Sequence, residues 1–326
     1  MIAGKYRLLA SIGRGGMGEV YVAEHLFSRR TVAIKVLSER LLSKKDIRRF
    51  LREARVMLRL DSEHVARVLD VGKLNSKQPY IVMEHLRGQD LDHLLRTRGR
   101  LDVPDAVACT LQAASALAEA HAIGVVHRDL KPSNLFLAQG PDGHAVVKVL
   151  DFGISLASDG ADFERITASA DVFGTPEYMS PEQTRSAKQV DARTDIWSLG
   201  LILAECLSGT PVFMGAMQVA MLAGAAREWM PNLHLEGTGT PRELENVIRR
   251  CLRKNPDHRY QSAAELVRAL RPFASAESLA KLAAGPVAPR PSDDASATTR
   301  DATTRAWLPA AANAALRRLM AVLRAV

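Results

Sequence analysis

Short runs of apolar and β-branched residues, separated by glycines and polar residues, dominate the first quarter of the chain. They predict strands at residues 6–11, 19–24, 31–37, 65–71 and 80–84. Apolar positions from Ile47 to Leu58 recur at alternating steps of three and four residues, which predicts a helix over residues 46–60. The first 86 residues are therefore expected to form a small, strand-rich unit with one main helix.

After Gly88 the pattern becomes that of helices. Residues 104–123 are rich in Ala and Leu, and the proline at 104 suits a first helical turn. Residues 195–207 are so apolar that the helix they form should be buried on most sides. We expect residues 87–273 to form a larger, mostly helical unit.

Two further helix starts are predicted from capping boxes. Thr240 and Ser262 are each followed by a glutamate three residues later. In this motif the hydroxyl and the carboxylate satisfy backbone amides at the start of the helix. We therefore expect a helix to begin at each of these two positions.

The end of the chain changes character twice. Residues 274–305 lose periodicity and are rich in Ala, Pro, Ser, Thr and Asp, which predicts a flexible linker. Residues 306–326 have apolar positions at helical spacing, which predicts an amphipathic helix. Arg317 and Arg318 interrupt its apolar run after about a dozen residues, short of the roughly 20 that span a membrane. Weak anchoring on an anionic lipid surface and packing on a protein both remain open.

Composition narrows the class of protein. The 326 residues are 47% hydrophobic and 25% charged, which is typical of a globular protein and excludes collagen, mucin and wholly disordered chains. Three distant cysteines argue against a disulfide framework or a zinc site and favour a cytoplasmic location. The net charge of +8 is a mild bias that suits an anionic ligand, and we expect no nucleic-acid partner. The N-terminal apolar run is too short for a signal peptide.

The first residues with candidate chemistry are Gly13-Arg-Gly15-Gly-Met-Gly18, between two predicted strands. Glycines let a backbone turn tightly and approach phosphate oxygens. A dinucleotide-binding turn has the same spacing but opens a helix, whereas the strand pattern continues here. Taken alone, the motif is equally well explained as a glycine-rich hairpin.

The next strand carries Val32-Ala-Ile-Lys35. A lysine one strand after a glycine loop could meet the α- and β-phosphates of a nucleotide. It would need a carboxylate to hold its long side chain, and Glu53 in the predicted helix is the candidate. Without the other motifs, both residues would be interpreted as solvated surface charges.

The sequence His127-Arg-Asp129-Leu-Lys131-Pro-Ser-Asn134 is much more specific. So many polar or constrained residues cannot form a buried strand or an ordinary helix face. In a catalytic loop, Asp129 could accept a proton from a hydroxyl, Lys131 could neutralise a γ-phosphate, and Asn134 could bind a hard cation.

The last motif is Asp151-Phe-Gly153, directly after an apolar strand predicted at residues 146–150. Asp151 would supply a second oxygen ligand, and Mg²⁺ prefers one or two carboxylates together with phosphate oxygens. The spacing to Asp129 makes a chance turn a poor explanation.

In this order and on these elements, the motifs resemble those of eukaryotic-like (Hanks-type) serine/threonine protein kinases. The glycine loop with Glu-Val-Tyr after it, and the run Gly174-Thr-Pro-Glu-Tyr-Met-Ser-Pro-Glu182, are most similar to bacterial members. The resemblance covers about residues 5–273. It implies a bilobal α+β fold, with a β-rich N-lobe over residues 1–86, a mostly helical C-lobe over residues 87–273, and a flexible C-terminal tail.

The resemblance also assigns residues. It makes Asp129 the catalytic base, Lys131 a phosphate-binding lysine and Lys35–Glu53 an ion pair. Asn134 and Asp151 become ligands of Mg²⁺, for which Mn²⁺ could substitute. The implied ATP-binding residues are Ile12, Gly13, Arg14, Gly15, Gly16, Met17, Gly18, Val20, Ala33, Lys35, Met83, Glu84, Leu86, Asp90 and Phe136.

Three more residues match structural positions of the family. Glu182 and Arg259 match a buried ion pair, and Asp195 matches an aspartate that braces the backbone of the catalytic loop. Ser180 replaces an alanine of the family pattern, a small-for-small change.

The implied activity is transfer of the ATP γ-phosphate to Ser or Thr hydroxyls of proteins, including the chain itself, in bacterial signal transduction. Activation is expected to involve phosphorylation of Thr167 or Ser169, and the threonines at 298–304 are candidate autophosphorylation sites. Phosphorylation in trans would involve a homodimer.

Two other classes remain. A pseudokinase is disfavoured because Lys35, Asp129, Asn134 and Asp151 are all present. A small-molecule phosphotransferase is disfavoured because such enzymes would lack the segment 174–182, which docks peptides in protein kinases.

Overall fold

The computed structural model describes residues 1–15, 17–74, 78–140, 144–152, 176–185, 190–213, 232–275 and 278. The chain forms two compact units. The first contains Met1–Asp61 and Ala66–Arg87, and the second contains Ser62–Val65 and the described residues from Gly88 onward. The predicted linker and terminal helix lie almost entirely outside the described residues.

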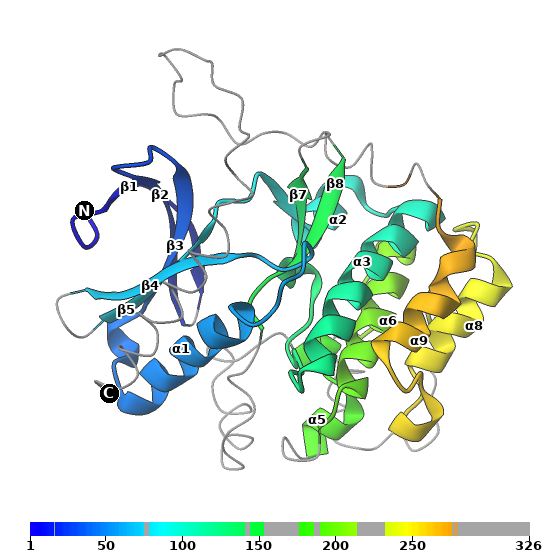
Figure 1. Cartoon of the computed structure of the whole chain (residues 1–326). Coiled ribbons are helices and arrows are strands. Elements are labelled where there is room, and N and C mark those ends of the chain that lie inside the picture. The colour runs from blue at the N-terminus through cyan, green and yellow to red at the C-terminus, as the bar shows by residue number, and fades with distance from the viewer. Residues whose placement is uncertain are drawn as a thin grey trace. The chain divides into compact units, whose positions relative to one another are not determined.

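The first unit is built on an antiparallel sheet of five strands (Figure 1), with the spatial order β1-β2-β3-β5-β4. The strands are β1 (Tyr6–Gly15), β2 (Gly18–His25), β3 (Thr31–Leu37), β4 (Val68–Leu74) and β5 (Gln78–Glu84). Buried side chains of β1, β2, β3 and β5 form an apolar cluster that includes Tyr6, Ile34 and Val82. The apolar runs that were predicted as strands thus pair in one sheet and bury this cluster.

Helix α1 (Lys44–Met57) lies against β4 and β5 of this unit (Figure 1). Its start is fixed by Ser43, whose hydroxyl accepts a hydrogen bond from the Asp46 amide at 3.2 Å. Phe50 and Leu51 are fully buried on one side of the helix. The predicted helix is confirmed, although it begins two residues earlier than expected because Ser43 acts as the cap.

The second unit is mainly helical. Its helices are α2 (Leu91–Arg98), α3 (Val103–Ala122), α5 (Pro181–Arg185), α6 (Arg193–Ser208), α8 (Arg242–Cys251) and α9 (Ala263–Leu270). A small antiparallel sheet contains β6 (Gly88–Asp90), β7 (Leu135–Gln139) and β8 (Ala145–Val149). Short 3₁₀ turns include Pro132–Asn134 and Pro176–Tyr178.

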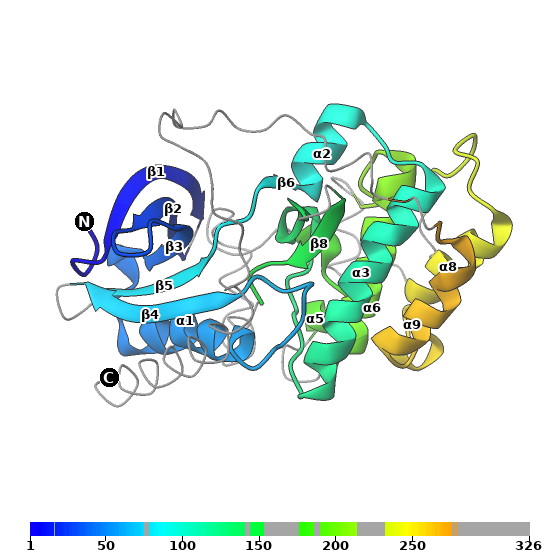
Figure 2. The ribbon, with the colours of Figure 1, turned by 45° about the horizontal axis from the view of Figure 1, so that its top comes forward.

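Helix α6 is the packing centre of this unit. It contacts α3, α8 and α9, which run beside it in both views (Figures 1 and 2). All of its residues from Thr194 to Leu207 are buried, as the apolar pattern predicted. At Gly200 a Cβ atom would lie 2.6 Å from the Cβ of Cys251, so glycine is required for the close approach of α8.

Some predicted boundaries are wrong. Strand β4 begins at Val68 rather than at Val65, which forms only an isolated parallel bridge to Val149. The capping box at Thr240 is absent: α8 starts after Pro241, and the Thr240 hydroxyl bonds the Thr238 hydroxyl at 2.6 Å instead. The cap at Ser262 is confirmed, with its hydroxyl 3.1 Å from the Glu265 amide nitrogen.

The three cysteines are free and buried, in agreement with the expected absence of a disulfide framework. Within the described part of the chain, no helix is long and apolar enough to cross a membrane.

Candidate active site

In the first unit, β3 and α1 bring Lys35 and Glu53 together. The Lys35 Nζ atom lies 2.9 Å from the Glu53 Oε1 atom, and both side chains are more than nine-tenths buried. A buried charge is costly unless it is paired, so each residue provides the other with the partner that its burial requires. Lys35 pairs across the sheet with Val20 on β2, which places it one strand from the glycine loop.

The glycine loop ends β1 and begins β2. A Cβ on Gly18 would lie 2.0 Å from the Val36 carbonyl oxygen, so the neighbouring strand β3 requires a glycine there. By contrast, a Cβ on Gly15 would have no atom within 4 Å, and one on Gly13 would make only an ordinary contact with Val20. Packing of the described residues therefore explains Gly18 but not Gly13 or Gly15.

The other expected residues of this loop differ in exposure. Ile12 is 55% exposed. The Arg14 guanidinium is 3.2 Å from the Glu19 carboxylate, and Met17 is half-buried. Gly16 lies outside the described residues.

Further residues of the implied ATP-binding set lie on β3, on β5 and in the segment after β5. Ala33 is buried and pairs with Met83 in the sheet. Glu84 exchanges two hydrogen bonds with Arg67: its amide donates to the Arg67 carbonyl, and its carboxylate accepts from the Arg67 amide, each at 2.9 Å. Leu86 is half-buried. These contacts fix the end of β5 and the start of the chain that follows it.

Asp90 and Phe136 belong to the second unit and face each other in the β6–β7 pair. The Asp90 carboxylate accepts the His93 amide at 2.8 Å and so caps helix α2. This cap is a structural reason for an aspartate at position 90, independent of any ligand.

Three residues of the motif at 127–134, in the second unit, form a cluster. The Lys131 Nζ atom is 3.1 Å from the Asp129 Oδ2 atom. The Asn134 amide nitrogen donates to the Asp129 carbonyl at 2.7 Å. Both of the charged side chains remain partly exposed. A carboxylate that can accept a proton therefore lies beside an ammonium group that can bind a phosphate.

Asn134 and Asp151 lie at neighbouring ends of β7 and β8. The Leu150 amide donates to the Asn134 carbonyl at 2.9 Å, which places Asp151 directly beyond that bond. Asp151 is exposed and has a left-handed backbone, with φ of 49°. Asn134 donates through its amide nitrogen, which leaves its amide oxygen as a potential ligand. One carboxylate and one amide oxygen suit Mg²⁺, so these residues fit the metal that the sequence implied.

Asp195, at the start of α6, holds the backbone before Asp129. Its carboxylate is fully buried and accepts the amides of His127 and Arg128, each at 2.9 Å. Arg128 has a φ of 67°, a strained conformation for a non-glycine residue. The two hydrogen bonds stabilise this strained backbone. They therefore fix the orientation of the backbone that leads into Asp129.

His121 is a part of this network that sequence reasoning missed. Its Nε2 atom lies 2.7 Å from the Asp195 carboxylate, at the end of α3. Among the described residues, its Nδ1 atom is buried without a hydrogen-bond partner. A proton on Nε2 would donate to the Asp195 carboxylate and so connect the end of α3 to this network. A lone histidine six residues before His127 was the available signal.

His127 itself connects the catalytic loop to the strand end at Leu150. Its Nε2 atom is 3.0 Å from the Leu150 carbonyl, and its Nδ1 atom accepts the Asp129 amide at 3.3 Å. Its ring lies 5.0 Å from that of the buried Phe152. The His127 imidazole thus links the backbone at Asp129 to the backbone at Leu150, the residue before Asp151.

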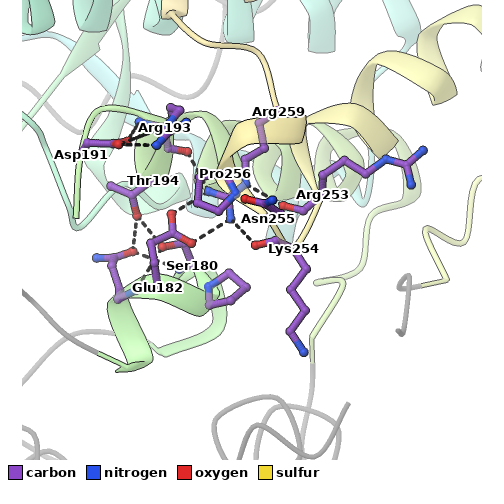
Figure 3. Close-up of polar contacts among 12 residues, drawn as sticks. Ser180, Glu182, Asp191, Arg193, Thr194, Arg253, Lys254, Asn255, Pro256 and Arg259 are labelled. Atoms are coloured by element: carbon purple, nitrogen blue, oxygen red, sulfur yellow. Dashed lines mark hydrogen bonds and ion pairs between the residues drawn. The ribbon is translucent and has the colours of Figure 1, made fainter. Parts of the chain in front are cut away.

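Glu182 and Arg259 form a bidentate ion pair in which the arginine is buried and the glutamate is largely buried (Figure 3). The two guanidinium nitrogens lie 2.6 Å and 2.8 Å from the two carboxylate oxygens. Ser180 is buried beside them, and its hydroxyl is 2.6 Å from that of Thr194 (Figure 3). The serine at this position therefore adds a hydrogen bond that an alanine could not make.

Glu205 on α6 is a second feature that the sequence did not reveal. The Tyr178 hydroxyl donates to its carboxylate at 2.5 Å. Burial raises the pKa of Glu205 to about 7; the Tyr178 hydrogen bond opposes this shift, and the nearby Asp92 and Glu177 carboxylates add to it.

The expected residues Gly153, Thr167, Ser169, Gly174 and Thr175 lie outside the described residues.

The chain matches known proteins over most of its length. A sequence profile of the protein kinase domain matches residues 6–269. The serine/threonine-protein kinase PknE of Mycobacterium bovis is 39% identical over 264 residues, which are 81% of this chain and 45% of PknE. PknB of Mycolicibacterium smegmatis is 39% identical, over 81% of this chain and 42% of PknB.

A third relative matches more of the C-terminal part. The kinase pkn3 of Myxococcus xanthus is 36% identical over 94% of this chain and 58% of its own length. The chain thus spans about half the length of these curated relatives. The crystal structure of the PknI kinase domain of Mycobacterium tuberculosis superimposes with a TM-score of 0.64 at 27% identity, covering 84% of this chain and 98% of that one.

Proposed function

Since this chain belongs to the protein kinase family and has its fold, we propose that it transfers the γ-phosphoryl group of ATP to Ser or Thr hydroxyls of proteins in bacterial signal transduction. The observation that carries the proposal is the cluster of Asp129, Lys131 and Asn134. The paired Lys35 and Glu53 support it.

Phosphoryl transfer needs alignment and charge stabilisation more than covalent chemistry from the protein. Asp129 would accept the proton of the substrate hydroxyl, and Lys131 would neutralise charge on the transferring phosphoryl group. Lys35, held in place by Glu53, would bind the phosphates that stay with the leaving ADP. The exposed Gly13 and Gly15 would let the β1–β2 loop approach the same phosphates.

ATP would require a divalent metal, and we propose Mg²⁺, with Mn²⁺ as a substitute. The Asn134 amide oxygen and the Asp151 carboxylate would hold it. The ion would neutralise phosphate charge when bound. The chain's own contribution is to place the two oxygen ligands at adjacent strand ends.

We propose protein substrates and a cytoplasmic location. Relatives named serine/threonine-protein kinases support protein substrates, and the three free cysteines support a reducing compartment. A transient homodimer for phosphorylation in trans and a weak contact of residues 306–326 with a membrane surface or a protein are part of the proposal.

The domain boundaries are also proposed. An N-lobe over residues 1–86 and a C-lobe over residues 87–273 are supported by the division of the chain near Arg87. A linker over residues 274–305 and a terminal helix over residues 306–326 rest on the sequence pattern.

The test is transfer of labelled γ-phosphate from Mg-ATP to a generic protein substrate and to the chain itself. Lys35→Ala and Asp151→Asn should each reduce the rate at least about a hundredfold, because both remove charge that meets the triphosphate or its metal. Lys5→Ala, which removes an exposed lysine of the first unit, is the matched control and should retain the parent rate.

Full activity of the Lys35→Ala variant would exclude the proposed mechanism. An inactive parent chain that still binds ATP would identify a pseudokinase, and transfer to small molecules but not to proteins would identify a small-molecule phosphotransferase.

A further inference from the structure

The outward side of α1 carries a row of cations. Lys44, Arg48, Arg52 and Arg55 are spaced by four, four and three residues and are all exposed. At 3.6 residues per turn they lie within an arc of about 80°. We refer to these four residues as the basic stripe; it runs along the helix for about 16 Å.

No acidic residue of α1 lies on this arc. Asp46 and Glu53 are on the opposite side of the helix, where Asp46 bonds the Ser43 hydroxyl and Glu53 bonds Lys35. Within the described part of the chain, none of the four side chains of the basic stripe forms an ion pair. Four adjacent cations repel one another and are costly to maintain without an anionic partner.

The chain itself contains a segment of complementary character. Residues 292–305 hold three aspartates, two arginines and four threonines, in addition to serines, and lie outside the described residues. Their charge is about −1 without modification. Two phosphates would bring it to about −4 to −5.

We propose that residues 292–305, once phosphorylated, dock on the basic stripe of α1. Phosphate oxygens pair with Arg side chains by short, often bidentate hydrogen bonds, so three arginines in one row are well suited to phosphothreonine. An acidic peptide without phosphate would offer only a small net charge.

The spacing of the two partners agrees. Thr298 and Thr303 are five residues apart, which is about 17 Å in an extended chain. This is close to the length of the basic stripe. From Ser275 to Thr298 the chain can span up to about 75 Å. Tethering would keep the segment at a millimolar effective concentration.

Phosphorylation of residues 292–305 by the chain itself rests on the proposed function. In each transfer the threonine oxygen bonds to the γ-phosphorus of ATP, the bond from that phosphorus to the β–γ bridging oxygen breaks, and ADP leaves. The hydroxyl proton passes to Asp129. The docked segment would then contact the helix that carries Glu53, the partner of Lys35.

The test uses a fluorescent synthetic peptide of residues 292–305 with phosphothreonine at 298 and 303. It is titrated against the full chain carrying Asp129→Asn, so that no transfer occurs during the measurement. We expect saturable binding that weakens as salt is added, and at least about tenfold weaker binding of the unphosphorylated peptide.

The decisive variant is Arg48→Glu/Arg52→Glu/Arg55→Glu, which should lose at least about tenfold in affinity. Arg242→Glu/Arg253→Glu/Arg271→Glu makes the same change at exposed positions of the second unit and should bind as the parent does. Should charge reversal unfold the helix, the milder triple replacement by Gln gives the same comparison. Circular dichroism verifies folding of each variant.

Equal affinity of the parent and the stripe variant, or no binding to the parent, would overturn the proposal. Stripe-dependent binding to vesicles containing phosphatidylserine, without binding of the phosphopeptide, would also overturn it and assign the surface to a membrane. Because the peptide carries its phosphates from synthesis, this result does not depend on the chain being an active kinase. Peptide mapping of the parent after incubation with Mg-ATP tests the supply of phosphate separately.

Discussion

Replacement of Arg259 by Met should strongly destabilise the second unit. Arg259 is 1% exposed, and its guanidinium donates to both oxygens of Glu182 and to the carbonyls of Arg193, Arg253 and Lys254 (Figure 3). Methionine has a similar length but no donor. The variant would therefore leave a largely buried carboxylate and three carbonyl oxygens without these partners.

The magnitude follows from the burial of the pair. Removal of one member of a buried ion pair costs about 3–5 kcal/mol, because the other charge stays buried and unpaired. In a domain of this size, 1 kcal/mol lowers the melting temperature by about 2–4 °C. The expected loss for Arg259→Met is therefore about 6–20 °C.

Thermal unfolding of the full chain, followed by circular dichroism, measures this loss. Arg250→Met is the control: Arg250 pairs with Glu265 at 2.7 Å, but its side chain is 46% exposed. An exposed pair contributes about 1 kcal/mol or less, so the control should lose only a few degrees. Arg259→Lys keeps the charge but not the bidentate geometry and should fall between the two.

A loss for Arg259→Met no larger than that of the control would refute the reasoning. The double variant Arg259→Met/Glu182→Leu gives a second check. It removes the unpaired carboxylate, so it should recover part of the stability that the single variant loses.

Three further predictions concern the site. His121→Phe should lower kcat about tenfold with little change in KM for ATP, since it removes a hydrogen bond to a buried carboxylate, and His121→Gln should restore much of the rate in steady-state kinetics. The raised pKa of Glu205, about 7 against an ordinary 4.5, means that the folded chain binds a proton that the unfolded chain has released between these values. Its contribution to stability is therefore lost as pH rises from about 4.5 to 7, and Glu205→Gln, which keeps an acceptor for Tyr178, should gain stability relative to the parent as pH rises through this range in urea titrations. Phosphatase-treated enzyme should show a lag that ends as Thr167 or Ser169 becomes phosphorylated; full initial activity with no phosphate on either residue after turnover would contradict this.

Local patterns predicted the elements of the first unit well. The three-four spacing from Ile47 to Leu58 identified α1 because its buried side needs apolar residues at that period. The start of β4 was misplaced because Val65 and Val68 are equally apolar. Val65 forms an isolated bridge to Val149 and is not part of β4, but Val149 is distant in sequence and the local pattern does not reveal this contact. Similarly, the sequence at Thr240 is that of a helix cap. In the structure, however, the Thr240 hydroxyl is hydrogen-bonded to the Thr238 hydroxyl and does not cap the helix.

The candidate site was predictable where short motifs encode it. Asp129, Lys131 and Asn134 are close in sequence, so a single loop brings them together. The Glu182–Arg259 pair joins residues far apart in sequence, and only the resemblance to a family suggested it. His121 and Glu205 carry no motif, because their roles arise from contacts with Asp195 and Tyr178, which are distant in sequence and which the sequence alone does not place beside them.

The three cysteines give the chain a built-in reporter of unfolding. Cys109, Cys206 and Cys251 all lie in the second unit, on α3, α6 and α8, and none is in the first. Burial raises the pKa of each thiol, to about 12 for Cys251, so the reactive thiolate is scarce while the helices stay packed. The rate at which an alkylating reagent modifies the native protein would therefore measure how often the helical second unit opens. No engineered label is needed, and opening of the first unit gives no signal because it contains no cysteine.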